Sequence, residues 1–136
     1  MSGITRIPTP YSYSSAVAAG DFVYLALHRG FGDTFEAQFA GVFDALRQTL
    51  ARFGLTLSSL VKVNVWLKDT QDLPAMDKGF GAYFPQDGFP ARMTATTAFI
   101  DDDCLLMIEG VAYAKGCPHD PGHTARPFPA QCAASP

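Results

Sequence analysis

The feature that most constrains the fold is a long amphipathic helix pattern between Thr34 and Phe53. Apolar side chains recur there at steps of three and four residues, namely Phe35, Phe39, Val42, Phe43, Leu46, Leu50 and Phe53. This spacing gathers them in one stripe along a helix, and the stripe has to be buried against another layer. We expect Asp33 to cap the helix with Glu36 three residues on, and Gly54 to end it at a positive φ.

The segments around this helix carry strand patterns. In residues 61–67 apolar side chains alternate with other residues, which is typical of a strand with one face on a core. The continuous apolar run 22–27 predicts a strand buried on both faces. Residues 92–99 and 104–113 are rich in strand-forming residues, and we expect them to form a hairpin that turns at 101–103.

A second helix is expected to start at the Asp69-Thr70 cap and to end before Pro85. Its apolar side chains are predicted to point inward, namely Leu73, Met76, Phe80 and Phe84. The order of elements is therefore strand, strand, long helix, strand, helix, strand, strand. This order predicts an α+β fold in which two helices cover one face of a mixed or largely antiparallel sheet.

Composition favours one folded domain over residues 1–115. The chain has 136 residues, of which 48% are hydrophobic and 17% charged, which is enough for a single core. Residues 116–136 are proline-rich and lack apolar periodicity, so we expect a C-terminal tail. The tail holds Cys117, His119, His123 and Cys132, but their spacing fits no common zinc pattern, and we expect no metal.

Charge and hydropathy exclude several classes of partner. The formal net charge is −3 and no basic stripe is visible, so the sequence gives no sign of a nucleic-acid surface. No apolar run approaches the ~18 residues of a membrane span, and the first residues do not resemble a secretory signal. We therefore expect a cytoplasmic protein whose three cysteines are reduced thiols.

The best candidates for chemistry are Arg92 and Glu109. In the predicted hairpin they become diagonal neighbours on one face. Glu109 shares its side of the strand with apolar residues, where a carboxylate is costly unless it is paired or lines a cleft. One interpretation is a catalytic pair, and the other is an ion pair that ties two strands or two subunits together.

The sequence around these two residues resembles that of the RidA/YjgF family of reactive-intermediate deaminases. Phe89-Pro90-Ala91-Arg92 resembles the family's Pro-Ala-Arg-Ser/Thr motif, and Ile108-Glu109-Gly110-Val111-Ala112 resembles Ile-Glu-Ala-Ile-Ala. The resemblance spans residues 10–115. It also includes Ser12-Tyr13-Ser14-Ser15-Ala16-Val17 before Gly20, Glu36-Ala37-Gln38, Val61 to Asp69, and Phe80 to Phe84.

The resemblance implies a chorismate-mutase-like subunit of the bacillus type that assembles as a homotrimer with clefts between neighbouring subunits. It implies hydrolysis of 2-imino or enamine acids to 2-keto acids and ammonia, with no cofactor. Arg92 would hold the substrate carboxylate through its guanidinium fork, and Glu109 would orient or deprotonate a water molecule. Tyr13 would wall the cleft or offer its hydroxyl group.

Some positions depart from the family pattern. Ala26-Leu27-His28 stands where the family usually has Ser-Gly-Gln, so Leu27 should narrow or reshape the wall of the cleft. His28 titrates near neutrality and is either a site residue or a structural histidine at a strand end. Thr94, where many relatives carry cysteine, completes the candidate substrate-binding set.

Two other functions remain open. The altered Ala26-Leu27-His28 wall is compatible with a trimer that binds a small carboxylate for regulation, without turnover. The family also carries an older label as a ribonuclease or translation inhibitor. The net negative charge of the chain argues against this function, because it disfavours binding to nucleic acid.

Overall fold

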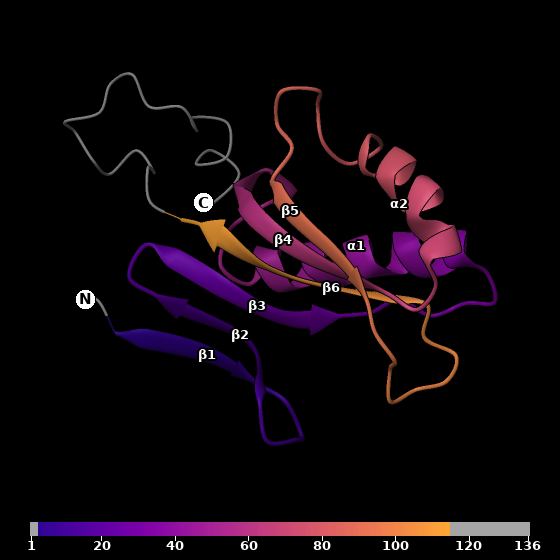
Figure 1. Cartoon of the computed structure of the whole chain (residues 1–136). Coiled ribbons are helices and arrows are strands. Elements are labelled where there is room, and N and C mark those ends of the chain that lie inside the picture. The colour runs from indigo at the N-terminus through magenta and orange to yellow at the C-terminus, as the bar shows by residue number, and fades with distance from the viewer. Residues whose placement is uncertain (1–2, 115–136) are drawn as a thin grey trace.

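The computed structural model describes residues 3–114, in which two helices lie on one face of a six-stranded sheet (Figure 1). The predicted α+β class, with both helices on the same face, is confirmed. The strands are β1 (Ile4–Pro8), β2 (Ser14–Ala19), β3 (Phe22–His28), β4 (Leu60–Leu67), β5 (Ala91–Thr96) and β6 (Leu106–Tyr113). The helices are α1 (Phe35–Ala51) and α2 (Leu73–Phe80), with short 3-10 turns η1 (Leu57–Ser59) and η2 (Thr70–Asp72). The predicted tail at 116–136 and its cysteines and histidines lie outside the described residues, so the boundary after residue 115 stays a prediction.

The sheet order is β1-β2-β3-β6-β4-β5, and the predicted hairpin between the last two strands is wrong. β6 is antiparallel to both β3 and β4, whereas β5 runs parallel to β4 at the edge. The parallel pair follows from the crossover through α2, which returns the chain to the same end of the sheet before β5 begins. The runs were correctly recognised as strands, but a strand pattern does not specify which neighbour the strand pairs with.

Helix α1 forms where its apolar stripe predicts it, although its N-terminus is capped by a different residue. The hydroxyl oxygen of Thr34 accepts a hydrogen bond from the backbone N–H of Ala37 at 3.0 Å, so Thr34 and not Asp33 is the N-cap. The two residues are adjacent and both are good caps, so the pattern alone does not separate them. Gly54 has the predicted positive φ, at 74°.

The core lies between the helices and the sheet. On β4 the buried side chains are Leu60, Val63, Val65 and Leu67, and on β6 they are Leu106, Ile108 and Ala112. Helix α2 contributes the buried side chains of Met76 and Phe80. Leu73 was expected to point inward, but it is exposed. Leu73 is the first residue of α2 and directly follows η2.

Neither helix covers the opposite face of the sheet (Figure 1), and apolar side chains of β3 are exposed on it. Strand β3 was expected to be buried on both faces, and this is wrong. Val23 and Leu25 are buried, whereas Phe22 is 38% and Tyr24 48% exposed. The reason is that both helices lie on one side, so alternate residues of an entirely apolar strand remain on the other. We call this uncovered side the open face. Neither helix is long and apolar enough to cross a membrane.

A candidate active site divided between two faces of the sheet

Glu109 lies in the middle of the open face. It stands opposite Asn64 in the register between β6 and β4, and Trp66 follows two residues on, on the same face. The carboxylate oxygen Oε2 accepts hydrogen bonds from Asn64 Nδ2 at 3.2 Å and from Trp66 Nε1 at 3.1 Å. Among residues 3–114, Oε1 has no hydrogen-bond partner. The carboxylate is therefore held by one oxygen and offers the other to water or to a ligand.

The Glu109 side chain faces a recess of about 900 Å³ with mainly apolar walls. Its larger apolar walls are Tyr11, Tyr13, Leu27, Trp66, Phe99 and Met107. Tyr13 stacks on Tyr11, with ring centroids 6.5 Å apart and planes 6° from parallel. Among the described residues, no lysine or arginine lines this recess. We call it the Glu109 recess.

One wall of this recess comes from residues 97–101 and 104, in a loop that is held through its residues 101–105. Arg29, nearly buried, bonds Asp101 Oδ2 at 3.1 Å and Asp103 Oδ2 at 3.2 Å. The hydrogen bond from Arg29 holds the pKa of the Asp103 carboxyl below its usual value. Gln38 on α1 accepts from Leu105 N at 2.8 Å and donates to the carbonyl oxygen of Asp103 at 2.9 Å. The loop is therefore anchored to α1 and to Arg29, the residue that follows β3.

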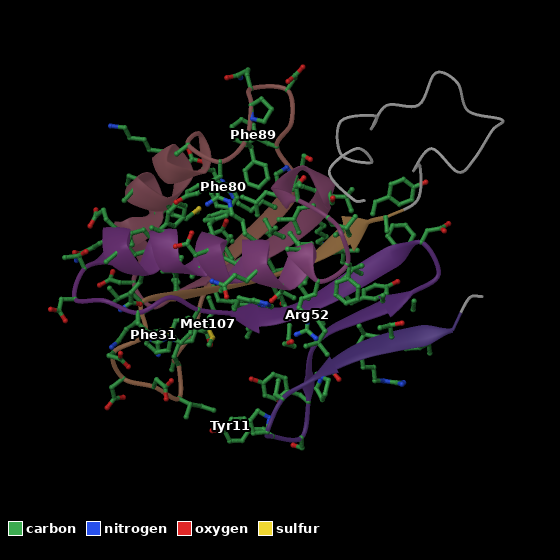
Figure 2. All side chains as sticks on the ribbon, turned by 180° about the vertical axis from the view of Figure 1, so that it is seen from behind. Tyr11, Phe31, Arg52, Phe80, Phe89 and Met107 are labelled. Carbon is green, nitrogen blue, oxygen red and sulfur yellow. The ribbon has the colours of Figure 1, made fainter. Side chains whose placement is uncertain are left out.

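Arg92 lies in a different recess, on the helix side of the edge strand β5. Its Nη2 donates to Asp77 Oδ1 at 2.9 Å, and its guanidinium carbon lies 5.1 Å from the centre of the Phe80 ring. Phe89 and Pro90 complete a hollow of about 380 Å³. Figure 2 shows Phe80 and Phe89 close together, with Tyr11 on the far side of the molecule. We call this hollow the Arg92 recess.

The structure does not make Arg92 and Glu109 diagonal neighbours, which corrects the sequence prediction. β4 lies between their strands, and its side chains alternate between the two faces. Arg92 stands opposite Val63, which points to the helices, whereas Glu109 stands opposite Asn64, which points to the open face. In one copy of the chain, the guanidinium and the carboxylate therefore serve opposite sides of the sheet.

His28 is on the helix side of the sheet and does not line the Glu109 recess. Its Nδ1 lies 2.6 Å from the carbonyl oxygen of Ala26, and its Nε2 lies 2.8 Å from Thr49 Oγ1. A carbonyl only accepts, so Nδ1 carries the proton and Nε2 accepts from the threonine hydroxyl. Burial lowers the pKa of this imidazole below 6.5. These contacts are those of a structural histidine that ties the end of β3 to α1.

The remaining predicted site residues divide between the two faces. Tyr13 and Leu27 line the Glu109 recess, and their role in substrate binding stays a prediction. Thr94 stands opposite Val65 on the helix side of β5 and lines neither recess. Within residues 3–114, no group of three or more histidine, cysteine, aspartate or glutamate side chains is arranged to hold a metal ion.

Three residues at the two recesses were not predicted to be functional. Asn64 and Trp66 hold the Glu109 carboxylate, and Asp77 pairs with Arg92. The alternation along residues 61–67 does put Asn64 and Trp66 on the face away from the core. The alternation does not show that β4 pairs with β6, and this pairing is what brings both side chains to Glu109. No local pattern marks Asp77, because its partner comes from a strand on the far side of a long connection.

The fold and the two recesses define a class of protein: a small α+β subunit with a mixed sheet, helices on one face, and a held carboxylate on the uncovered face. Residues 3–114 match the family model described as Endoribonuclease L-PSP. The chain is 30% identical to a RutC family protein of Pyrococcus abyssi, over 81% of this chain and 93% of the relative. It is 28% identical to the 2-iminobutanoate/2-iminopropanoate deaminase of Dermatophagoides farinae, over 73% and 83%.

A solved structure from Streptococcus pyogenes, described as a member of the yjgF family, superposes with a TM-score of 0.76 at 32% identity. The match covers 85% of this chain and 99% of that one. The chain belongs to the RidA/YjgF family.

Proposed function

We propose that this protein hydrolyses 2-imino or enamine acids to 2-keto acids and ammonia. The observation that carries the proposal is the Glu109 carboxylate, which is fixed through Oε2 by Asn64 and Trp66 in a mainly apolar recess. A carboxylate held in this way presents its second oxygen in a defined direction, which is what a general base or a water-orienting group needs. The relative from Dermatophagoides farinae, named a 2-iminobutanoate/2-iminopropanoate deaminase, supports the same chemistry.

The complete site is proposed to form between copies of the chain. Arg92 and Glu109 face opposite sides of one sheet, so a single small substrate meets both only if they come from different copies. The open face supports this arrangement, because exposed Phe22, Tyr24 and Met93 give it an apolar surface suited to self-association. The edge strand β5 of one copy would then lie over the open face of the next. The family resemblance implies a homotrimer.

In the proposed reaction, Arg92 holds the substrate carboxylate and Glu109 takes a proton from water. The water oxygen forms a bond to C2 while the C=N π electrons move to nitrogen, which gives a carbinolamine. The proton taken by Glu109 passes to that nitrogen. Glu109 then takes the proton of the new hydroxyl group and passes it to the same nitrogen as the C–N bond breaks, its electron pair leaving with the nitrogen, and ammonia is released. The remaining oxygen becomes the carbonyl of the 2-keto acid. This chemistry uses no cofactor.

Keto-acid release from imines generated in situ by an amino-acid oxidase tests the proposal. Glu109→Gln keeps the size of the side chain and an acceptor for Asn64 and Trp66, and it should lower turnover by ~10²-fold or more. Arg92→Ala should remove a charge-assisted contact of roughly 1.5–3 kcal/mol, and Arg92→Lys should restore only part of it. Melting temperatures should stay near that of the parent. Parental rates in Glu109→Gln, or early melting of the variants, would reject the catalytic assignment.

A second candidate function is a carboxylate-binding or regulatory assembly of the same family without turnover. It is favoured by the separation of Arg92 from Glu109 in one copy and by Leu27 in the recess wall. Under this alternative, unreactive carboxylates still bind through Arg92, but the protein does not speed keto-acid release above the rate in its absence. The same assay, run with the parent protein, separates the two functions.

A further inference from the structure

The Arg92 recess contains a second charge that the proposed reaction does not use. Asp77, on α2, pairs with Arg92 at 2.9 Å and is the only other charged residue lining the hollow within residues 3–114. Phe80, Phe89 and Pro90 supply the remaining walls. The recess thus presents one positive and one negative group in contact, surrounded by apolar surface.

The two charged groups differ in how firmly they are held. The Arg92 side chain is 28% exposed, and its guanidinium carbon lies over the Phe80 ring, which attracts the cation. The Asp77 side chain is 67% exposed. An ion pair this open to water adds little stability, so a ligand can adjust it without a large penalty. Arg92 uses only Nη2 on Asp77, and the remaining N–H groups of its fork stay available.

This arrangement discriminates between kinds of acid. A simple carboxylate that binds Arg92 brings a second negative charge next to Asp77, and the repulsion offsets part of the gain. An acid with a positively charged nitrogen on C2 carries a negative and a positive charge side by side. The recess carries the complementary pair, a positive and a negative group side by side. Its carboxylate matches Arg92 and its nitrogen matches Asp77.

We propose that Asp77 and Arg92 form a binding site for zwitterionic 2-nitrogen acids, with the carboxylate on Arg92 and the ammonium or iminium nitrogen on Asp77. The assignment of Arg92 to the ligand carboxylate rests on the proposed function. Asp77 then acts as a specificity residue. It accepts the N–H of a 2-iminium acid and repels the 2-keto acid product, which has lost its nitrogen, so the same contact favours substrate binding and product release.

Binding of two matched, unreactive ligands tests this assignment without any turnover. 2-Aminobutanoate carries both charges, and butanoate carries only the carboxylate. Calorimetry or NMR titration of the full chain should give tighter binding of 2-aminobutanoate to the parent protein. In Asp77→Asn, the affinity for 2-aminobutanoate should fall by about tenfold because a charged partner is lost. The affinity for butanoate should rise several-fold because a repulsion is removed. The amide oxygen introduced by Asp77→Asn can still accept from Arg92, so the fold should be preserved.

Asp102→Asn is the matched control. It makes the same charge change on an exposed residue that lines neither recess, and both affinities should stay unchanged. If both ligands bind more tightly to Asp77→Asn by the same factor, Asp77 only competes with the ligand carboxylate for Arg92, and the zwitterion site is rejected. Unchanged affinities in Asp77→Asn, or unchanged 2-aminobutanoate binding in Arg92→Ala, reject it as well.

The outcome is separable from that of the proposed function. If the parent protein does not discriminate between the two ligands while turnover still depends on Arg92 and Glu109, the Asp77 assignment alone is rejected. Discrimination that persists in a protein without imine hydrolysis rejects the deaminase proposal and leaves the binding site standing.

Discussion

Along β3, both faces of the sheet carry apolar side chains, but the surroundings of these side chains differ. On the helix face, the Phe43 ring of α1 is stacked 4.1 Å from Tyr83, which follows α2, and lies edge-on to Phe80 of α2. On the open face, Phe22, Tyr24 and Leu27 stand beside a mainly apolar recess that contains Glu109. The comparison indicates that one face stabilises the single chain, whereas the other is suited to contacts with further copies and with a ligand.

The largest effect is expected for a cavity on the helix face. Phe43→Ala removes a fully buried ring that contacts several aromatic neighbours, and it should lower the free energy of unfolding by about 3–5 kcal/mol. Denaturant unfolding monitored by circular dichroism measures this change. A loss below ~1 kcal/mol would mean that the helix face is not the stabilising layer described here.

The next largest effect should come from a charge on the open face. Tyr24→Lys should weaken association between copies by ~10²-fold or more, because a buried unpaired charge opposes an apolar interface. The secondary structure should persist, since Tyr24 is half-exposed in the single chain. Light scattering measures the mass, with Asp44→Lys on the exposed side of α1 as the control. A parent protein that is monomeric at micromolar concentration would reject the difference between the two faces.

A smaller effect is expected when Glu109 loses one of its donors. Trp66→Phe keeps most of the ring but removes the Nε1–H that bonds Oε2, and it should lower turnover by about tenfold. The melting temperature should change little. The Asn64 bond remains in this variant, so the loss should be smaller than that of Glu109→Gln. Turnover equal to that of the parent would show that the hydrogen bond from Trp66 does not position the carboxylate.

The smallest effect should be a pH dependence from His28. Its pKa is lowered in the folded state by burial, so the unfolded chain takes up a proton more readily. Stability should be fully present above pH 6.5 and should fall as the pH drops from 6.5 towards the folded pKa. His28→Gln should flatten this part of the profile of melting temperature against pH. An equally steep fall in the variant would assign the dependence to other groups.

The helix face was largely predictable from the sequence because its signals are local. The stripe of α1, the Gly54 stop and the alternation along β4 depend on neighbours within a few residues. The open face misled the prediction at Phe22–Leu27, since an apolar strand has the same pattern whether its second face is covered by the same chain or not. The two motifs drew attention to Arg92 and Glu109, whose catalytic roles stay a prediction. Their separation came from strand order, which depends on pairing between distant segments.

The central place of β6 has a consequence for how the chain acquires its structure. β6 is the last strand of the described residues, yet it pairs with both β3 and β4 and joins the β1-β2-β3 ribbon to the β4-β5 pair. During synthesis, the two pieces emerge from the ribosome before the strand that connects them. The sheet therefore closes only after residue 113 is free, through contacts that are distant in sequence and slow to form. Until then the nascent chain exposes two unpaired inner edges, and chaperones that shield strand edges should matter most in this interval.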